Sequence, residues 1–488
     1  MEQNLVSGAV NAARPSWDAS RLVPRIVHLG CGAFHRAHQA LYTHRLLSSS
    51  DSDWGICEVS LMSGRGAQLI GDLNAQNRLY TVAERGAGGT ELHIVGAVAE
   101  ALHPQSDGCQ AILEALARPE TAVVSLTITE KGYCTGAASG QLDLNNPLIQ
   151  HDLADPQQPQ SAIGYLVEAL AIRRRRGLPG FTVLSCDNVR ENGHVAKAAV
   201  TGLAQARDAE LAAWIAQHVT FPCTMVDRIV PAATAETLDE IAQQLGVYDP
   251  CAIACEPFHQ WVIEDNFVNG RPEWDRVGAQ FVSDVVPFEL MKLRMLNGSH
   301  TFLACLGYLA GYRTIAETVS DPAFRRAARS LMQDEQAPTL TMPPDTDLSG
   351  YAARLIERFS NPALKHQTAQ IASDSSQKLP QRLLDPIRQH LREGSDWRYL
   401  ALGVAGWMRY VGGVDDRGER YTVVDPLAAT FAAIHQQPQT PAERVRALLD
   451  IGDIFGSDLP AHPHFVDAIT VAYCQLLNDG AAAAVAAR

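Results

Sequence analysis

Two short apolar runs constrain the fold of the first half of this chain more than any other feature. They read "AVVSLTIT" (122–129) and "FTVLSC" (181–186) and contain no charged residue. Strands covered by helices on both faces have this composition, whereas strands with one face in water alternate between apolar and polar residues. A helical pattern at 162–176 separates the two runs. The arrangement predicts a parallel sheet built from strand–helix–strand units.

Two earlier runs extend this pattern. "RIVHLG" (25–30) predicts the first strand, with a helix from about Ala33, and "WGICEVSLM" (54–62) predicts the second strand. The first strand ends in Gly30 and Gly32, which match the first two positions of the dinucleotide fingerprint G-x-G-x-x-G. His35 stands at the third position. We therefore predict an α/β Rossmann-type N-terminal domain.

The glycine turn defines the predicted cofactor-binding residues. Gly30 permits the tight turn, Gly32 lets the backbone approach a pyrophosphate, and Ala33 and Phe34 open the helix that follows. An ordinary strand-to-helix turn is the alternative reading. NAD-binding domains usually place an acidic residue at the tip of the second strand, but here Glu58 lies within the strand. Arg65 near the tip suits a 2′-phosphate or is a solvated loop residue, so NAD and NADP both stay open.

The character of the sequence changes after about residue 220. Strand-like segments around 220–235, 251–267 and 278–285 are separated by polar or Gly/Pro-containing turns, which predicts a partly antiparallel extension of the same sheet. From Pro287 the pattern is helical almost to the end, which predicts a mostly α-helical C-terminal domain. A chain of 488 residues is too long for one core. We expect two domains, residues 1–286 and 287–488.

The C-terminal domain should consist of eight helices. Their predicted ranges are 288–309, 322–335, 350–358, 380–393, 397–411, 426–435, 441–451 and 463–477.

The first of these helices carries polar groups in an apolar setting. The stretch "MKLRMLNGSHTFL" (291–303) holds Lys292, Asn297 and His300, and Glu289 lies just before it. With Lys292 at zero on an ideal helix, Glu289 falls near about +60°, His300 near about +80° and Asn297 near about +140°. The four groups share one sector, and burying them without partners would be costly.

This sector suits hydride transfer between a nicotinamide and a carbonyl carbon. A lysine whose pKa is lowered by burial and neighbouring cations can exchange the proton of the hydroxyl group. An asparagine amide can donate to the developing oxyanion, histidine can orient a substrate hydroxyl, and Glu289 can pass protons to water. The alternative is a satisfied polar network with a purely structural role. Asn188 follows the strand 181–186, at the sheet edge where α/β proteins bind ligands, although asparagine also favours turns.

Charge and cysteine content exclude several classes of function. The net charge of −14 argues against binding to nucleic acid or to anionic membranes. We find no signal peptide and no stretch of about 18 apolar residues, and we expect a cytoplasmic protein. Cys251 and Cys255 form a C-x-x-x-C pair without a second ligand pair at zinc spacing. We therefore expect reduced thiols and no metal site.

Six motifs together resemble the long-chain polyol dehydrogenases, the mannitol dehydrogenase family. They are "GCGAFHRAHQALY", "SLTITEKGY", "SCDNVRENG", "MVDRIVPA", "EPFHQWVIED" and "KLRMLNGSH", and the resemblance runs from about residue 24 to about residue 410. It implies a metal-independent, NAD-dependent secondary alcohol dehydrogenase that acts as a monomer. By motif position, Lys292 would be the general acid/base, with Asn188 and Asn297 as oxyanion-binding groups. His300 would bind a substrate hydroxyl, and Glu289 would gate proton exchange.

The resemblance also bears on the substrate. Glu130 would lie near nicotinamide and substrate, and Lys378 would reach the far end of the substrate. Mannitol dehydrogenases carry an arginine several residues before that lysine, where this chain has Gln370. The departure disfavours mannitol and is compatible with a sugar acid, whose carboxylate needs a cation such as Lys378, Arg382 or Arg228.

A closer match within the family supports the sugar acid. It lies in "HLGCGAFHRAHQALYTH", "ALHPQSDGC" and "CEPFHQWVIEDNFVNGRP", and it points to members that interconvert D-mannonate and D-fructuronate in glucuronate catabolism. Oxidation of mannitol or reduction of another ketose is the alternative. A nucleotide-sensing protein without turnover is a further alternative, against which the intact set of Lys292, Asn297 and His300 argues.

Overall fold

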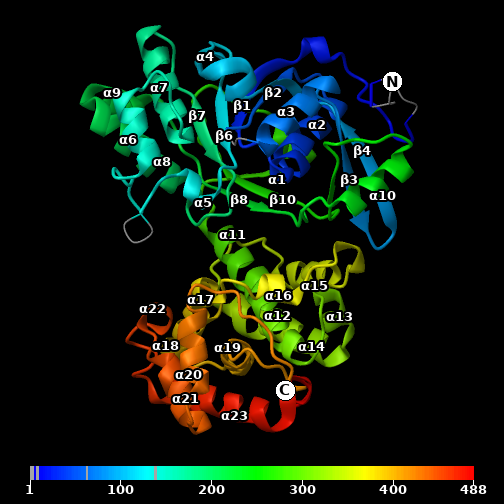
Figure 1. Cartoon of the computed structure of the whole chain (residues 1–488), viewed down its shortest axis with the longest axis vertical. Coiled ribbons are helices and arrows are strands. Elements are labelled where there is room, and N and C mark those ends of the chain that lie inside the picture. The colour runs from blue at the N-terminus through cyan, green and yellow to red at the C-terminus, as the bar shows by residue number, and fades with distance from the viewer. Residues whose placement is uncertain (1–4, 7–9, 62–63, 137–139) are drawn as a thin grey trace. The chain divides into compact units, whose positions relative to one another are not determined.

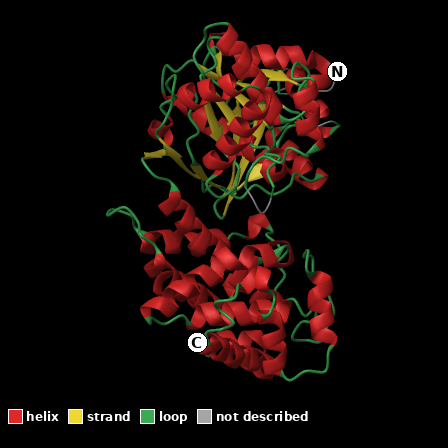
Figure 2. Cartoon of the chain, turned by 90° about the vertical axis from the view of Figure 1, so that its left-hand side faces the viewer, coloured by secondary structure: helices red, strands yellow, loops and turns green. Residues whose placement is uncertain are grey.

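The computed structural model describes residues 5–6, 10–61, 64–136 and 140–488. The chain divides into two compact units, Met1–Val286 (unit 1) and Pro287–Arg488 (unit 2) (Figure 1). Every strand of the described residues lies in unit 1, and unit 2 is built from helices and loops (Figure 2). The predicted fold class, a Rossmann-type α/β unit followed by a mostly helical one, is confirmed. None of the helices described combines the length and the apolar character that crossing a membrane requires.

The central sheet of unit 1 has five parallel strands in the order β5-β2-β1-β6-β7. Their bounds are β1 Val23–Leu29, β2 Trp54–Val59, β5 Val98–Leu102, β6 Val123–Leu126 and β7 Thr182–Ser185. The strand order reverses between β1 and β6, so the carboxyl ends of these two strands form the topological switch point where such sheets bind ligands.

Helices cover both faces of this sheet, which explains the continuous apolar runs. Val27 and Leu29 of β1 belong to one core cluster with residues of α4 (Pro104–Ala117) and α7 (Ala162–Arg175). Ile26 of the same strand belongs to a second cluster with α2 (Gln39–Ser49) and α3 (Arg65–Ala75). Successive residues of a strand point to opposite faces, so neither face is left for water.

The other helices of unit 1 surround the sheets. They are α1 Ala33–Ala37, α5 Thr129–Gly132, α6 Pro147–Ala154, α8 Asn192–Arg207, α9 Ala209–His218 and α10 Ala235–Leu245, with the short 3₁₀ helices η1 Ala19–Arg21 and η2 Trp274–Val277.

The strands after residue 220 lie in two further sheets, one of which they share with strands from residues 80–95, so the predicted extension of the main sheet is wrong. One sheet has the order β11-β10-β8 and the other β4-β3-β9. The bounds are β8 Thr224–Asp227, β10 Gln260–Glu264, β11 Gln280–Val282, β3 Tyr80–Gly86, β4 Gly89–Val95 and β9 Ile253–Cys255. Antiparallel pairing, which the sequence predicted after residue 220, occurs between β8 and β10. The strands β3 and β4 also pair antiparallel.

A proline explains why the main sheet stops at β7. Thr220 forms a single bridge with Thr182 of β7. Pro222 then offers no N–H for a continuing ladder. The side chain of Asn192 spans the resulting gap, since it donates to the Thr224 carbonyl (2.9 Å) and accepts from the Thr224 N–H (2.9 Å).

Two further differences concern the first hundred residues. We assign no strand from the sequence at the positions of β3, β4 or β5. The helix predicted from Ala33 is interrupted at His38, which has φ −122° and ψ −90° and separates α1 from α2.

Unit 2 contains helices in all eight predicted ranges. Its α-helices are α11 Val286–Met291, which begins at the last residue of unit 1, α12 Ser299–Leu309, α13 Ile315–Ser320, α14 Pro322–Ser330, α15 Leu348–Phe359, α16 Thr368–Ile371, α17 Ser375–Leu379, α18 Asp385–Glu393, α19 Arg398–Tyr410, α20 Ala428–Gln436, α21 Pro441–Leu449, α22 Gly452–Phe455 and α23 Pro463–Ala486. Three π-helical segments are η3 Lys292–Gly298, η4 Leu331–Gln336 and η7 Pro380–Leu384, and two 3₁₀ turns are η5 Ala337–Thr339 and η6 Pro362–Leu364. We had not predicted α13, α16, α17 or α22.

Candidate active site

Gly30 and Gly32, the two glycines after β1, are glycines for different structural reasons. Gly30 has φ +111°, and a Cβ there would lie 2.1 Å from the backbone oxygen of Thr127 in the neighbouring segment. No other residue type fits this position. Gly32 is the N-cap of α1, and the nearest atom to a Cβ there would be the Gly30 oxygen at 3.8 Å.

The open space at Gly32 fits a dinucleotide. It lies at the carboxyl end of β1, beside the switch point of the sheet, where a backbone without side chain lets a pyrophosphate approach the start of the next helix. The half-buried Ala33 and Phe34 open that helix, as predicted from the sequence. Glu58 does not face this space, because its carboxyl group is hydrogen-bonded to His35 Nε2 (2.7 Å) in the protein interior. Arg65 is exposed at the first residue of α3.

One carboxylate ties together the two segments that hold Glu130, in α5, and Asn188, in a loop. Both residues are exposed, Glu130 after β6 and Asn188 after β7. The buried Asp187 accepts hydrogen bonds from the Thr129 N–H (2.8 Å) and the Tyr133 hydroxyl (2.7 Å). Burial raises the pKa of Asp187, although these hydrogen bonds oppose the shift.

The role of Asp187 was missed from the sequence. Thr129 has φ +62°, a conformation that costs free energy in a residue other than glycine, and the Asp187 contacts hold it. The available signal was the position of Asp187 beside Asn188, at the carboxyl end of a buried strand.

The polar sector of unit 2 lies on a π-helix, which the sequence did not reveal. Lys292 is the first residue of η3, and Asn297 is five residues later, near its end. Hydrogen bonds in a π-helix join residues five apart, so Lys292 and Asn297 are neighbours one turn apart instead of about 140° apart as on an ideal α-helix. Both side chains are half-buried, as is Glu289 in α11. Single π turns within α-helices occur frequently at functional sites.

His300 provides a buried polar atom without a protein partner. The side chain sits in α12, the residue is 7% exposed, and no described residue hydrogen-bonds its Nε2. Its ring packs against Phe359 (4.5 Å between centroids) and His366 (5.2 Å). Burial, together with His366, Arg358 and Arg382, lowers the pKa of His300 well below its usual range. The ring is therefore neutral at physiological pH and can accept or donate one hydrogen bond at Nε2.

Of the three predicted carboxylate-binding cations, Arg382 lies near this histidine, and Lys378 lies near Arg382. Arg382 in η7 donates through Nη1 to Thr301 Oγ1 (3.1 Å) and to the Asn297 backbone oxygen (3.4 Å). Burial lowers the pKa of Arg382 to about 10, so the guanidinium stays charged. Lys378 in α17 donates to the Ser373 backbone oxygen (2.5 Å), and burial followed by repulsion from Arg382 lowers its pKa.

The third cation, Arg228, is not available to a substrate. It lies in unit 1 with 1% of its side chain exposed and forms an ion pair with Glu84. Its other donors are taken by the backbone oxygens of Ala37 and Glu256. The prediction for Arg228 is corrected to a structural role in the core of unit 1.

The two units match the two domains of a known enzyme family. Residues 24–276 match the mannitol dehydrogenase Rossmann domain, and residues 284–477 match the mannitol dehydrogenase C-terminal domain. The chain belongs to the mannitol dehydrogenase family.

Individual members of the family are similar over nearly their whole length. A D-mannonate oxidoreductase of Escherichia coli (strain K12) is 70% identical over 483 residues, which cover 99% of both chains. The mannitol 2-dehydrogenase of Pseudomonas fluorescens, solved as a ternary complex with NAD and D-mannitol, is 40% identical with a TM-score of 0.82, over 96% of this chain and 95% of that chain. A substrate-free D-sorbitol dehydrogenase is 34% identical with a TM-score of 0.92, over 99% of both chains.

Proposed function

We propose that this chain is an NAD-dependent D-mannonate oxidoreductase, also called fructuronate reductase. The reaction is D-mannonate + NAD⁺ = D-fructuronate + NADH + H⁺, a step of hexuronate catabolism. The observation that carries this proposal is the 70% identity to a D-mannonate oxidoreductase over 99% of both chains. We assign residues 1–286 as the NAD-binding domain and residues 287–488 as the substrate and catalytic domain.

Lys292 is the general acid/base in this proposal. During oxidation its neutral amine takes the proton of the substrate hydroxyl, and during reduction its ammonium returns that proton to the ketone oxygen. Bound NAD supplies the hydride acceptor. Glu289, half-buried three residues before Lys292, exchanges the proton with water.

The amides of Asn297 and Asn188 stabilise the charge that develops on the substrate oxygen. The π turn, which makes Asn297 and Lys292 neighbours on the helix, supports the proposal that donor and acid/base address the same oxygen. By motif position, Asn188 in the loop after β7 would supply the second amide, and Glu130 in α5 would lie near the nicotinamide. His300 binds a substrate hydroxyl through Nε2, which satisfies the buried atom that no described residue hydrogen-bonds.

Arg382 is the proposed anchor for the substrate carboxylate. Only its Nη1 makes hydrogen bonds to described residues, which leaves a planar pair of donors suited to a carboxylate. Lys378, four residues earlier on the same helical segment, contributes a second positive charge at that end of the substrate. Gln370, where mannitol dehydrogenases carry arginine, is exposed in α16.

A substrate panel tests this function. Purified protein is mixed with NADH or NADPH and with D-fructuronate or D-fructose, and coenzyme absorbance is followed. We expect the highest kcat/KM with NADH and D-fructuronate. A preference for D-fructose would favour the mannitol 2-dehydrogenase alternative, and tight NADH binding without turnover of any substrate would favour a nucleotide sensor.

We further propose a monomeric, cytoplasmic enzyme, as the family resemblance suggests. Light scattering coupled to size-exclusion chromatography should give the chain mass of 52.9 kDa. A multiple of that mass would refute the monomer.

A further inference from the structure

A fully buried polar row crosses the sheet directly beneath the glycine turn. Glu58 of β2, His28 of β1 and Ser125 of β6 are register partners on adjacent parallel strands, so their side chains point to the same face. His35 from α1 completes the group. Glu58, His28 and His35 are 0% exposed and Ser125 is 3% exposed. Polar groups this deep in a sheet need a reason beyond packing.

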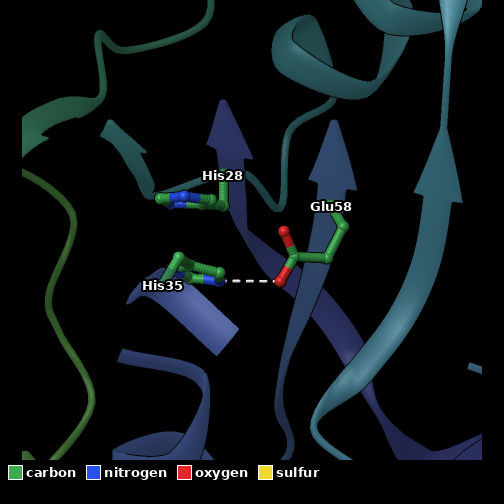
Figure 3. A group of neighbouring side chains, drawn as sticks. All are labelled: His28, His35 and Glu58. Carbon is green, nitrogen blue, oxygen red and sulfur yellow. Dashed lines mark hydrogen bonds and ion pairs between the residues drawn. The ribbon is translucent and has the colours of Figure 1, made fainter. Parts of the chain in front are cut away.

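The two imidazole rings are stacked (Figure 3). The rings of His28 and His35 lie 3.3 Å apart between centroids and 10° from parallel, with Glu58 beside the edge of His35. A metal ion would have to lie in the plane of each ligating imidazole. Two parallel planes at this spacing share no such point, so the geometry disfavours a metal centre for these three residues.

The hydrogen bonds of His28 converge on the glycine turn. Its Nε2 lies 3.0 Å from the Gly30 backbone oxygen and 2.9 Å from Thr127 Oγ1. The Gly30 oxygen is also the acceptor for Thr127 Oγ1 (2.7 Å) and for the Gly32 N–H (2.6 Å). A carbonyl oxygen cannot donate, so Nε2 carries the proton, and Nδ1 accepts from Ser125 Oγ (2.7 Å). Burial, with His35 as a second cause, lowers the pKa of His28 well below its usual range, in agreement with a neutral ring.

The proton arrangement of His35 follows from its neighbours. His38 Nε2 faces the backbone oxygen of Gln260 (2.9 Å) and therefore donates, which leaves His38 Nδ1 to accept from Gln39 Nε2 (3.0 Å). The oxygen of the Gln39 amide then faces His35 Nδ1 (3.2 Å), which must donate. The remaining His35 nitrogen, Nε2, lies 2.7 Å from a Glu58 oxygen and forms a hydrogen bond with it. Every nitrogen of the stacked pair has an assigned partner.

We propose that His35, Glu58 and His28 are positioning residues for the coenzyme, which hold the Gly30–Gly32 turn in the geometry that receives the pyrophosphate. This inference rests on the proposed function, because it takes the bound dinucleotide as given. In the common fingerprint a third glycine lets helix and strand pack closely. Here the His35 ring fills that space, and its stacking fixes the His28 ring that donates to Gly30. At the position of the third glycine, this chain therefore has a histidine whose contacts support the Gly30–Gly32 turn.

The test uses His35→Gly, which gives the chain the complete sequence motif G-x-G-x-x-G. If the fingerprint alone mattered, NADH binding would be kept. The proposal predicts that the Kd for NADH, measured by fluorescence titration, rises about tenfold or more, as expected for a displaced binding group. At saturating NADH, kcat with D-fructuronate should change little, because the support does not touch the reacting atoms.

Two Glu58 variants and one control complete the experiment. Glu58→Ala should weaken NADH binding, and Glu58→Gln, which keeps an oxygen acceptor for His35, should retain it. Leu116→Ala is the matched control: Leu116 is 0% exposed in the core cluster on the opposite face of the sheet, so its truncation lowers the melting temperature without touching the turn.

Each outcome decides the proposal. Folded His35→Gly or Glu58→Ala with unchanged NADH affinity overturns it, as does an equal loss of affinity in Leu116→Ala. If His35→Gly does not fold, the comparison of Glu58→Ala with Glu58→Gln decides. If neither His35→Gly nor Glu58→Ala folds, the network is a folding element and the proposal fails. Because NADH binding is measured without substrate, failure of the proposed reaction would show separately.

Discussion

Single alanine substitutions at Gly30 and Gly32 should separate a glycine that the fold needs from a glycine that the coenzyme needs. In Gly30→Ala the new Cβ would lie 2.1 Å from the Thr127 backbone oxygen, and φ is +111°. The strained backbone conformation costs about 1–3 kcal/mol. Overlap with a backbone atom, which cannot rotate away, adds about 1–3 kcal/mol. The sum is a large part of a typical unfolding free energy of about 5–15 kcal/mol.

Gly32→Ala should behave differently. Gly32 has φ −87° and ψ 175°, which alanine adopts readily, and the nearest atom to the new Cβ is 3.8 Å away. The less favourable N-cap costs up to about 1 kcal/mol. The lower entropy of the unfolded chain offsets this by about 0.4–1 kcal/mol. Stability should therefore change little, while the Cβ occupies the space proposed for the pyrophosphate and weakens NADH binding.

The assay measures both properties on the same samples. Urea unfolding followed by circular dichroism reports stability, and fluorescence titration reports the Kd for NADH. We expect a strongly lowered urea midpoint for Gly30→Ala, and a near-normal midpoint with weakened NADH binding for Gly32→Ala. Normal stability of Gly30→Ala, or normal NADH affinity of Gly32→Ala, would refute the reasoning.

Three further predictions follow from the charged groups. Arg382→Leu should raise KM for D-fructuronate by about tenfold or more, the cost of losing a charge-assisted pair, and should change KM for D-fructose little. The control is Arg388→Leu, because Arg388 pairs with Asp385 and Asp458 at the surface. Equal effects of both variants would count against Arg382 as the carboxylate anchor. Glu84→Gln should destabilise the protein by about 3–5 kcal/mol at neutral pH, because it leaves Arg228 buried without its partner. Burial alone would raise the pKa of Glu84. Hydrogen bonding to His93 and the charges of Arg228 and Arg45 outweigh burial and lower this pKa from 4.5 to about 2. The stabilisation by the Glu84 carboxylate is complete above pH 4.5 and is lost as the pH falls toward 2. The urea midpoint of Glu84→Gln should therefore depend less on pH in this range than that of the wild-type protein. Identical pH profiles would contradict the assignment.

The sequence predicted the parallel sheet because burial on both faces leaves a local signature. The strands β6 and β7 are continuous runs without a charged residue, and the glycine turn follows β1 directly. The strands β3 and β4 carry charged residues such as Glu84 and Glu91, so they lack that signature. The hydrogen bonds between Asn192 and Thr224, which bridge the gap between the main sheet and β8, join residues 32 positions apart that meet only in the folded chain.

The predicted site residues divide in the same way. Lys292, Asn297 and His300 were found because polar groups inside an apolar helix are conspicuous. Their true spacing around the helix was not predicted, because a π turn cannot be recognised in a sequence pattern that is analysed at 3.6 residues per turn. Arg228 was proposed for the substrate carboxylate because sequence alone cannot show that Glu84, 144 residues away, already pairs with it.

The central claim is that the Lys292 amine exchanges the proton of the substrate hydroxyl. Single-turnover oxidation of NADH by D-fructuronate, compared between the wild-type protein and Lys292→Ala, tests it most directly. We expect the rate to fall by about 10²–10⁴-fold, the usual contribution of a positioned acid/base, while the Kd for NADH is unchanged. A Lys292→Ala protein that binds NADH normally and reduces D-fructuronate at a near-normal rate would contradict the claim.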